Sequence, residues 1–134
     1  MRNLVIVLAV AAALSACGSE TIVSAEASVA GTYTAKTANG SNLPFTAATT
    51  PVKVEVVSGS TTLTAAGSFT STTKTRFTSP AGSSDTDNNF AGSFKLNGST
   101  ITFSTNDGST FSGTIAGGTL TVAQQGITLV STKN

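Results

Sequence analysis

Residues 90–130 read FAGSFKLNGSTITFSTNDGSTFSGTIAGGTLTVAQQGITLV, and this segment indicates the architecture. Large apolar residues recur at every second or fourth position, and runs containing glycine interrupt them at 97–98, 106–108, 117–118 and 125–126. A period of two is typical of half-buried antiparallel strands, and glycine tolerates the positive φ angles of tight hairpin turns. The segment therefore predicts five successive strands in an up-and-down meander.

The chain before residue 90 continues the strand pattern. Residues 31–38, 52–65 and 68–78 each alternate apolar or small residues with polar ones. Gly59 lies where the alternation of the second segment changes parity, and an isolated glycine in a strand pattern often marks a β-bulge. Counting 52–65 as one bulged strand gives eight strands in total.

The predicted fold class is all-β. No segment shows the 3.6-residue period of an amphipathic helix, and the outward strand positions are mainly threonine and serine, which suit a pleated surface. An eight-stranded meander leaves two unpaired edges unless the sheet closes on itself. We therefore expect an antiparallel up-and-down barrel of eight strands.

Two connections are expected to be irregular. Asn39 and Gly40 form a strong hairpin signal, but the proline-containing segment that follows to Pro51 predicts a longer loop over one end of the sheet. Residues 79–88, SPAGSSDTDN, are the longest run of turn-forming residues in the chain and predict a flexible tip.

The first seventeen residues have the pattern of an export signal. Residues 4–13 form an uncharged apolar run after Arg2, which suits a signal peptide and is well short of the ~20 residues that span a bilayer. Residues 14–17, LSAC, resemble the bacterial lipobox, in which the cysteine sulfur receives diacylglycerol and cleavage leaves an acylated N-terminus. The resemblance implies that residues 1–16 are removed and that Cys17 is the lipidation site.

The alternative is an ordinary signal peptide with an incidental cysteine. Cleavage after Ala16 would place Leu14 where such a site needs a small residue, so the lipobox fits better. Cys17 is the only cysteine, which excludes an intramolecular disulfide. Residues 17–28 predict a lipidated, flexible tether, and residues 29–134 the barrel.

The lipobox resemblance also implies a partner and a location. Acylated Cys17 would attach the chain to a lipid membrane of the cell envelope. No aspartate follows Cys17 directly, and resemblance to lipoprotein sorting in Gram-negative bacteria then favours the outer membrane.

Composition argues against several function classes. Without Arg2 the chain has six basic and six acidic residues, a balance that does not favour nucleic-acid binding. The absence of histidine excludes Ser-His and Cys-His catalytic arrangements and histidine metal sites. We therefore expect no enzyme activity, no cofactor and no metal.

One acidic segment has an alternative interpretation. Residues 85–89, DTDNN, place oxygen-bearing side chains at the first, third and fifth positions, as in a calcium-binding EF-hand loop. The sixth position, which should be glycine, is Phe90, and the twelfth, which should be glutamate, is Leu96. A solvated turn is therefore the favoured interpretation.

The start of the predicted domain resembles a known family. Gly31-Thr32-Tyr33 resembles the Gly-x-Trp start of the lipocalins, with Tyr33 in place of the tryptophan, and the similarity extends over roughly residues 29–132. The later lipocalin motifs have no clear counterpart. The resemblance implies a small barrel whose interior is open to a hydrophobic ligand.

The barrel interior is expected to be apolar and aromatic. The alternation directs inward Tyr33, Val54, Leu63, Phe69, Phe77, Phe90, Phe94, Ile101, Phe103, Phe111, Ile115, Leu120, Val122, Ile127 and Leu129. The candidate ligand-binding residues are Tyr33, Phe69, Phe77, Phe94, Phe103 and Phe111. An eight-stranded barrel of this size either is filled by side chains or holds one small ligand.

Three functions follow from these expectations. The first is a membrane-anchored lipoprotein that binds a small apolar molecule. The second is a structural or partner-binding lipoprotein with a filled core, and the third is an adhesin-like β-sandwich module. A cavity would favour the first function, a filled interior the second, and two packed sheets the third.

Overall fold

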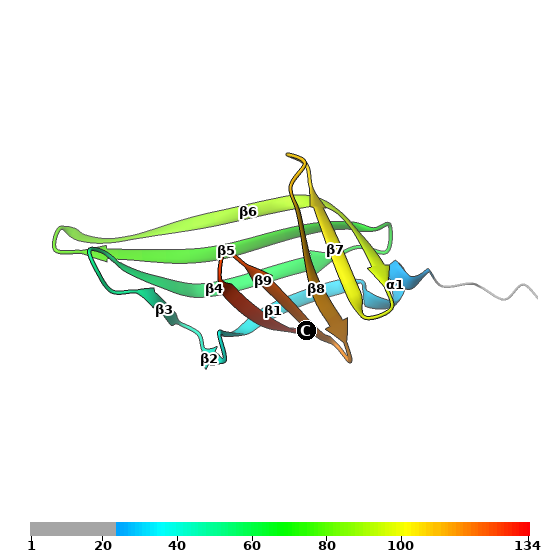
Figure 1. Cartoon of the computed structure of the whole chain (residues 1–134), viewed down its shortest axis with the longest axis horizontal. Coiled ribbons are helices and arrows are strands. Elements are labelled where there is room, and N and C mark those ends of the chain that lie inside the picture. The colour runs from blue at the N-terminus through cyan, green and yellow to red at the C-terminus, as the bar shows by residue number, and fades with distance from the viewer. Residues whose placement is uncertain (1–23) are drawn as a thin grey trace, which may run out of the picture.

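The computed structural model describes residues 24–134, which are almost entirely β-structure (Figure 1). These residues form one short helix and ten strands. The elements are α1 (Ala25–Val29), β1 (Gly31–Ala38), β2 (Ser41–Asn42), β3 (Phe45–Ala48), β4 (Lys53–Leu63), β5 (Ser68–Ser79), β6 (Gly82–Asn97), β7 (Thr100–Thr105), β8 (Thr110–Ala116), β9 (Thr119–Gln124) and β10 (Ile127–Lys133).

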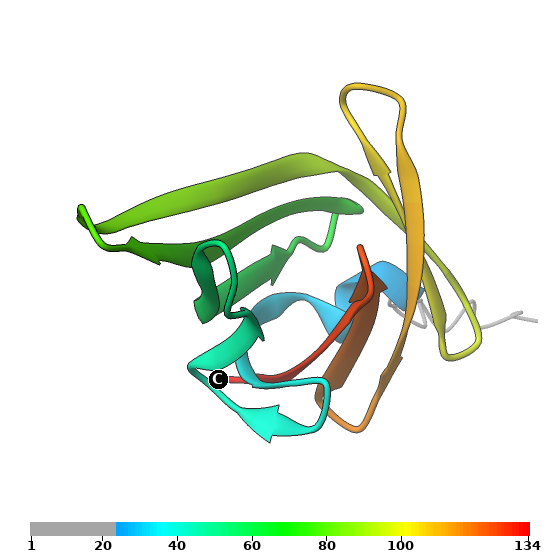
Figure 2. The ribbon, with the colours of Figure 1, turned by 60° about the vertical axis from the view of Figure 1, so that its left-hand side comes forward.

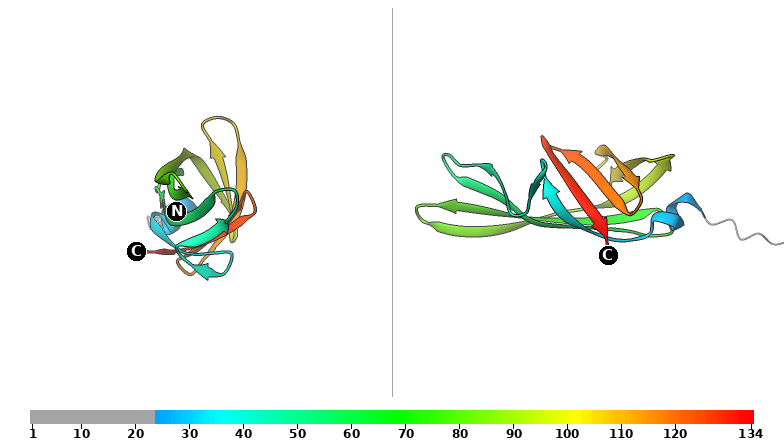
Figure 3. Two further views of the ribbon diagram at one scale, coloured as in Figure 1. Left: turned by 90° about the vertical axis from the view of Figure 1, so that its left-hand side faces the viewer. Right: turned by 90° about the horizontal axis from the view of Figure 1, so that it is seen from below.

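Eight of the strands close into an antiparallel barrel. The sequence of neighbours runs from β1 through β10, β9, β8, β7, β6 and β5 to β4, and β1 then pairs with β4. Tyr33 shows the closure directly, because it lies opposite Lys133 of β10 on one side and Thr61 of β4 on the other. The view along the long axis shows the resulting ring (Figure 3). The predicted eight-stranded up-and-down barrel is confirmed, and the alternative of a two-sheet sandwich is wrong.

Two glycines allow neighbouring strands to approach closely where the barrel bends. A Cβ atom at Gly92 would lie 1.9 Å from the carbonyl oxygen of Ser104, and one at Gly113 would lie 2.2 Å from that of Thr121. Glycine within a strand commonly marks such an approach of another backbone. Figure 2 shows β6 curving from the extended sheet toward the crossing with β7 and β8.

The predicted bulge in β4 is present two residues before the expected glycine. The register between β4 and β5 shifts between Val56 and Ser58, so Val57 is the additional residue. The shift allows both Val56 and Leu63 to be buried. Gly59 faces inward instead, where an added Cβ would lie 3.1 Å from the Cβ of Ala35.

The flexible tip predicted for residues 79–88 is wrong. Strand β5 continues to Ser79, which lies opposite Gly82 at the start of β6, so that only Pro80 and Ala81 form the turn. The remaining residues of the predicted tip are part of β6. The long β5–β6 hairpin extends beyond the barrel at the end remote from α1 (Figure 1).

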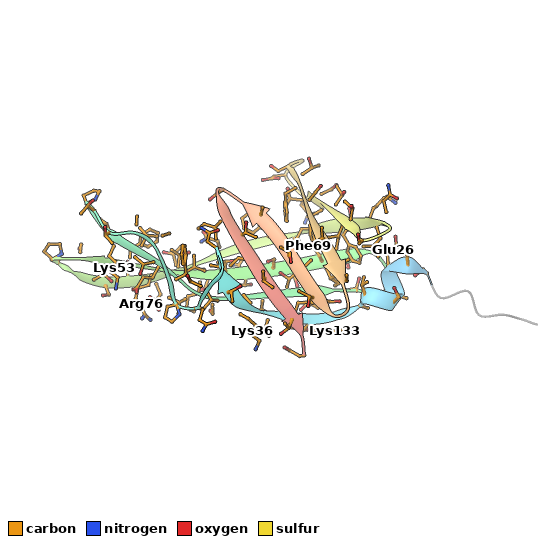
Figure 4. The ribbon with its side chains drawn as sticks, turned by 60° about the horizontal axis from the view of Figure 1, so that its bottom comes forward. Glu26, Lys36, Lys53, Phe69, Arg76 and Lys133 are labelled. Atoms are coloured by element: carbon orange, nitrogen blue, oxygen red, sulfur yellow. The ribbon has the colours of Figure 1, made fainter. Side chains whose placement is uncertain are left out.

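Cross-strand pairs explain why these turn-forming residues adopt a strand. Arg76 Nε lies 2.8 Å from Asp85 Oδ1, and Lys74 Nζ lies 3.1 Å from Asp87 Oδ1, each pair being opposite in register. Opposite charges that face one another across an antiparallel pair stabilise it. Local composition predicts a turn here, but pairing with β5 determines the structure. Figure 4 shows Arg76 and Lys53 on this part of the sheet.

The loop predicted after Asn39 is also more ordered than expected. Asn39 and Gly40 have φ values of 48° and 81°, and they connect β1 to β2 in a tight turn that places Ala38 opposite Ser41. The segment then forms β3, which pairs with β4. The Asn-Gly signal therefore makes a tight hairpin despite the prolines that follow.

The only helix in residues 24–134 closes one end of the barrel. The Ser24 side chain accepts a hydrogen bond of 3.1 Å from the backbone N–H of Ala27 and caps α1. Val29 packs against the core, and its carbonyl oxygen accepts a hydrogen bond of 2.7 Å from the Tyr33 hydroxyl. The helix occupies the end of the segment expected to be a tether, and five residues are too few to show a helical period.

Most of the expected inward residues lie in the core, pack against it or line a cavity, but Val54 does none of these. Phe77 is the second exception. Its side chain is 38% exposed, because β5 has left the barrel by that point and Phe77 lies on the protruding hairpin opposite Val54 and Ser84. The alternation continues through Phe77, but none of the strands in residues 24–134 covers its side chain there. The prediction that Phe77 lines the interior is wrong.

Candidate ligand cavity in the barrel

The interior of the barrel differs between its two ends. The end near α1 is filled by a cluster of buried side chains, which we call the plug. The plug consists of Tyr33, Leu63, Phe69, Phe94, Ile101, Phe103, Ile115 and Leu120. Val29 of α1 packs against it from outside. Close packing of this kind leaves no room for a ligand within the plug itself. A separate open groove of about 360 Å³ lies outside the plug, between α1, the β4–β5 turn and β6.

Aromatic rings form the boundary between the plug and the open part of the barrel. The ring centroids of Phe103 and Phe111 are 4.8 Å apart in a stacked arrangement, and those of Phe103 and Phe69 are 4.8 Å apart edge to face. A small cavity of about 30 Å³ lies against these rings. Its volume is about that of one water molecule.

A larger cavity lies further along the barrel and opens at the end opposite the plug. It has a volume of about 160 Å³. Its lining consists of Val56, Thr73, Thr75, Asn88, Phe90, Val122, Gln124, Gln125, Ile127 and Leu129. The small cavity shares Thr73, Val122, Gln124 and Leu129 with it, so the two spaces adjoin. We call the larger space the mouth cavity.

The course of β5 shows how the plug and the mouth cavity are arranged. Phe69 lies in the plug, Ser71 and Thr73 line the small cavity, and Thr73 and Thr75 line the mouth cavity. The mouth cavity therefore opens at the end remote from α1. Figure 4 shows Glu26, on α1, at one end of the molecule, with Phe69 among the barrel strands.

The polar groups of the cavities are neutral and partly paired with one another. The hydroxyls of Thr61 and Ser71 lie 2.9 Å apart, and Asn88 Nδ2 donates a hydrogen bond of 3.3 Å to Thr75 Oγ1. Within residues 24–134, no buried side-chain nitrogen or oxygen lacks a partner. The site therefore combines apolar walls with uncharged hydrogen-bonding groups.

The six candidate ligand-binding residues separate into three groups. Phe69, Phe103 and Phe111 line the small cavity, and Phe69 and Phe103 are also part of the plug. Tyr33 and Phe94 belong to the plug. Phe77 lines neither cavity. The sequence thus predicts that Phe69, Phe103 and Phe111 face the interior, but it does not distinguish cavity-lining residues from those of the plug.

Sequence reasoning missed the polar part of the mouth cavity. Thr73 and Thr75 have the inward parity of Phe69, a signal that could have identified them. Asn88 was missed because it falls within the predicted flexible tip. Gln124 was missed because it lies at the end of a strand, next to a turn. The mouth cavity exists because β6 and the β9–β10 hairpin both reach beyond the plug.

The acidic segment considered for calcium has a different structure. Asp85 and Asp87 are in β6, on the outer face of the sheet, and each forms an ion pair with a residue of β5. An EF-hand needs a loop that wraps around the ion. Among residues 24–134, no group of three or more acidic, histidine or cysteine side chains is placed to hold a metal.

Comparison of the chain with protein-family models, with curated proteins and with solved structures found no match. Within the described part of the chain, no helix combines the length and apolar character needed to cross a membrane.

Proposed function

We propose that this chain is a membrane-anchored lipoprotein whose barrel binds a small hydrophobic ligand. The observation that supports binding is the mouth cavity, with its volume of about 160 Å³ and its walls of Val56, Phe90, Ile127 and Leu129. Small-molecule sites are usually concave and combine apolar walls with polar groups that orient the ligand, and this cavity has five apolar and five polar lining residues.

The volume limits the size of the ligand. An apolar cavity of roughly 150 Å³ holds one benzene molecule. The mouth cavity is of that size, and the plug prevents deeper entry. The ligand is therefore a single ring or a short chain, and a long fatty acid would have only its end enclosed.

The proposed anchor is acylated Cys17, which lies outside the described residues. Residues 18–23 separate it from Ser24, and six residues span at most roughly 20 Å. Because Ser24 precedes α1, the anchor would hold the plugged end of the barrel toward the membrane. The mouth cavity would then face away from it, and we propose the outer membrane of the cell envelope as the location.

The anchor is tested by Cys17→Ser in the native host. We expect loss of the acyl group by mass spectrometry and loss of the protein from the membrane fraction. Ser19→Ala is the matched control, because it leaves the lipobox intact. Retention of the Cys17→Ser protein in membranes would contradict the anchor.

Ligand binding is tested by NMR titration of the full-length chain carrying Cys17→Ser with toluene. The backbone amide shifts of Val122 and Gln124 report ligand in the mouth cavity. They therefore distinguish it from ligand that binds to the apolar residues 1–16. We expect saturable shifts, which Phe111→Trp weakens by filling the space next to the cavity. Absence of saturable shifts in the unsubstituted barrel would contradict ligand binding.

A second function, partner binding, is favoured by a different observation. Among the strands of the described residues, only β5 pairs with residues 82–90 of β6, which leaves an exposed strand edge along the protruding hairpin. Such edges pair with extended segments of other proteins. If toluene does not bind, a structural or partner-binding role of this hairpin becomes the better proposal.

A further inference from the structure

No charged side chain of residues 24–134 lines the small cavity or the mouth cavity. None of the residues that line the small cavity or the mouth cavity is ionisable. Lys74 and Asp87, which neighbour the lining residues Thr73 and Asn88 along the chain, point to the outer face, where they form an ion pair with side chains 40% and 50% exposed. A ligand in the mouth cavity therefore meets no fixed charge of either sign from the described part of the chain.

This absence penalises a charged ligand. Transfer of a carboxylate or an ammonium group from water to such a site costs hydration free energy that no opposite charge offsets. A neutral polar group loses less, because the side chains present can replace its hydrogen bonds with water. The cavity should therefore select neutral ligands over charged ones of the same size.

The polar lining of the mouth cavity comes from β5, β6 and the end of β9, and it suits a neutral hydrogen-bonding group. Asn88 donates through Nδ2 to Thr75, which leaves its carboxamide oxygen to accept a hydrogen bond. Gln124 lines both cavities and offers a donor and an acceptor in one amide. The ring of Phe90 lines the mouth cavity, and the ring of Phe111, with its centroid 6.5 Å from that of Phe90, lines the adjoining small cavity.

We infer that the ligand is an uncharged molecule of about one ring in size with a single hydrogen-bonding group, such as an amide or a hydroxyl. Its apolar part lies against Phe90, Ile127 and Leu129, and its polar group meets Asn88 and Gln124. This inference rests on the proposed function, since it specifies the ligand of the same cavity.

The test compares benzamide with benzoate, which have nearly the same shape and differ in charge at neutral pH. The full-length chain carrying Cys17→Ser is titrated with each, and the amide shifts of Val122 and Gln124 are followed. We expect benzamide to bind at least about tenfold more tightly than benzoate. Toluene, which lacks a polar group, serves as the reference for occupancy of the cavity.

Two substitutions of Gln124 test whether the preference for benzamide over benzoate arises in the mouth cavity. Gln124→Lys supplies a positive charge and is expected to reverse the preference in favour of benzoate. Gln124→Leu is expected to weaken benzamide binding more than toluene binding, both followed by the amide shift of Val122. The control is Thr102→Lys, which adds the same charge on the exterior and is expected to leave the ratio unchanged.

The possible results separate the two proposals. Binding of toluene with equal affinities for benzamide and benzoate overturns the inference about charge and leaves the proposed function standing. Failure of all three probes to bind overturns both. The proposed function and the inference about charge are both supported if the unsubstituted cavity prefers benzamide, Gln124→Lys reverses this preference and Thr102→Lys does not. The ratio of the benzamide and benzoate affinities of the unsubstituted cavity tests the inference about charge even if a Gln124 variant fails to fold.

Discussion

The hydroxyl of Tyr33 donates a hydrogen bond of 2.7 Å to the carbonyl oxygen of Val29 and thereby joins α1 to the first barrel strand. Tyr33 is 1% exposed and belongs to the plug, so this polar contact lies at the edge of an otherwise apolar cluster. The bond fixes the helix over the closed end of the barrel.

Tyr33→Phe tests this contact. The substitution keeps the ring and removes the hydroxyl, so we expect a loss of about 1 kcal/mol in the free energy of unfolding, measured by urea denaturation. Thr34→Val is the control, because it removes an exposed hydrogen bond to Asn134 and is expected to cost less than about 0.5 kcal/mol. Equal losses would show that the bond to Val29 contributes nothing specific.

The raised pKa of Tyr33 predicts that the folded chain loses stability at alkaline pH. Burial raises the pKa of Tyr33 above its usual value, because the phenolate would lose its hydration. Since the folded pKa lies above the unfolded pKa of about 10, the stabilisation is present below that pH and is lost as the pH rises through the folded pKa. Tyr33 is the only tyrosine and the chain has no tryptophan, so phenolate absorbance reports it alone. Titration at the pH found for the urea-unfolded chain would contradict this prediction.

Gly92→Ala and Gly113→Ala are expected to destabilise the barrel by about 2 kcal/mol or more, because the added methyl group meets a strand backbone that has no flexible end to move. The matched control is Ser93→Ala at an exposed position of β6, with an expected change within about 0.5 kcal/mol. Urea denaturation compares all three proteins. Alanine tolerated at both glycine positions would mean that the strands are further apart than described.

The sequence predicts the barrel well because its strongest signals are local and repeated. The runs at 97–98, 106–108, 117–118 and 125–126 each occur where the structure turns between adjacent strands. The parity of Phe94 and Phe103 places both in the core, and they lie opposite one another in β6 and β7. These features depend on turn chemistry and on a period of two, which the sequence contains in full.

The errors concern features that depend on contacts between distant residues. Residues 79–88 have turn composition, but pairing with β5 makes most of them a strand. Phe77 has core parity, but β5 has left the barrel before that position. The mouth cavity depends on how far each strand extends beyond the plug, a length that alternation does not encode.

The turn between β7 and β8 predicts an acid-dependent loss of stability. The Asp107 carboxylate accepts a hydrogen bond from the Thr105 hydroxyl and one of 3.0 Å from the backbone N–H of Ser109, and these bonds lower its pKa. A lowered folded pKa means that the stabilisation is present above the unfolded pKa of about 4 and is lost as the pH falls through the folded value.

Asp107→Asn is therefore expected to be less stable than the unsubstituted chain at neutral pH and equally stable at pH values below the folded pKa of Asp107. Thr105→Val removes the first of the two hydrogen bonds to the carboxylate. In a chain that carries Thr105→Val, the stability lost on changing Asp107 to Asn at neutral pH is therefore expected to be smaller. Thermal denaturation across the acid range measures both effects. A stability difference between the unsubstituted chain and the Asp107→Asn variant that stays constant with pH would contradict the role of the carboxylate charge.

The final prediction tests the register of the barrel at two adjacent residues of β7. Phe103 is 1% exposed and contacts the rings of Phe69 and Phe111, whereas Thr102 lies on the outer face with its hydroxyl 3.4 Å from that of Ser112. Phe103→Ala leaves a hole in the plug and is expected to cost about 3–5 kcal/mol in urea denaturation. Thr102→Ala removes only an exposed side chain and is expected to cost less than about 1 kcal/mol. Because a shift of one residue would exchange the two faces of the strand, comparable losses at the two positions would show that the register is wrong.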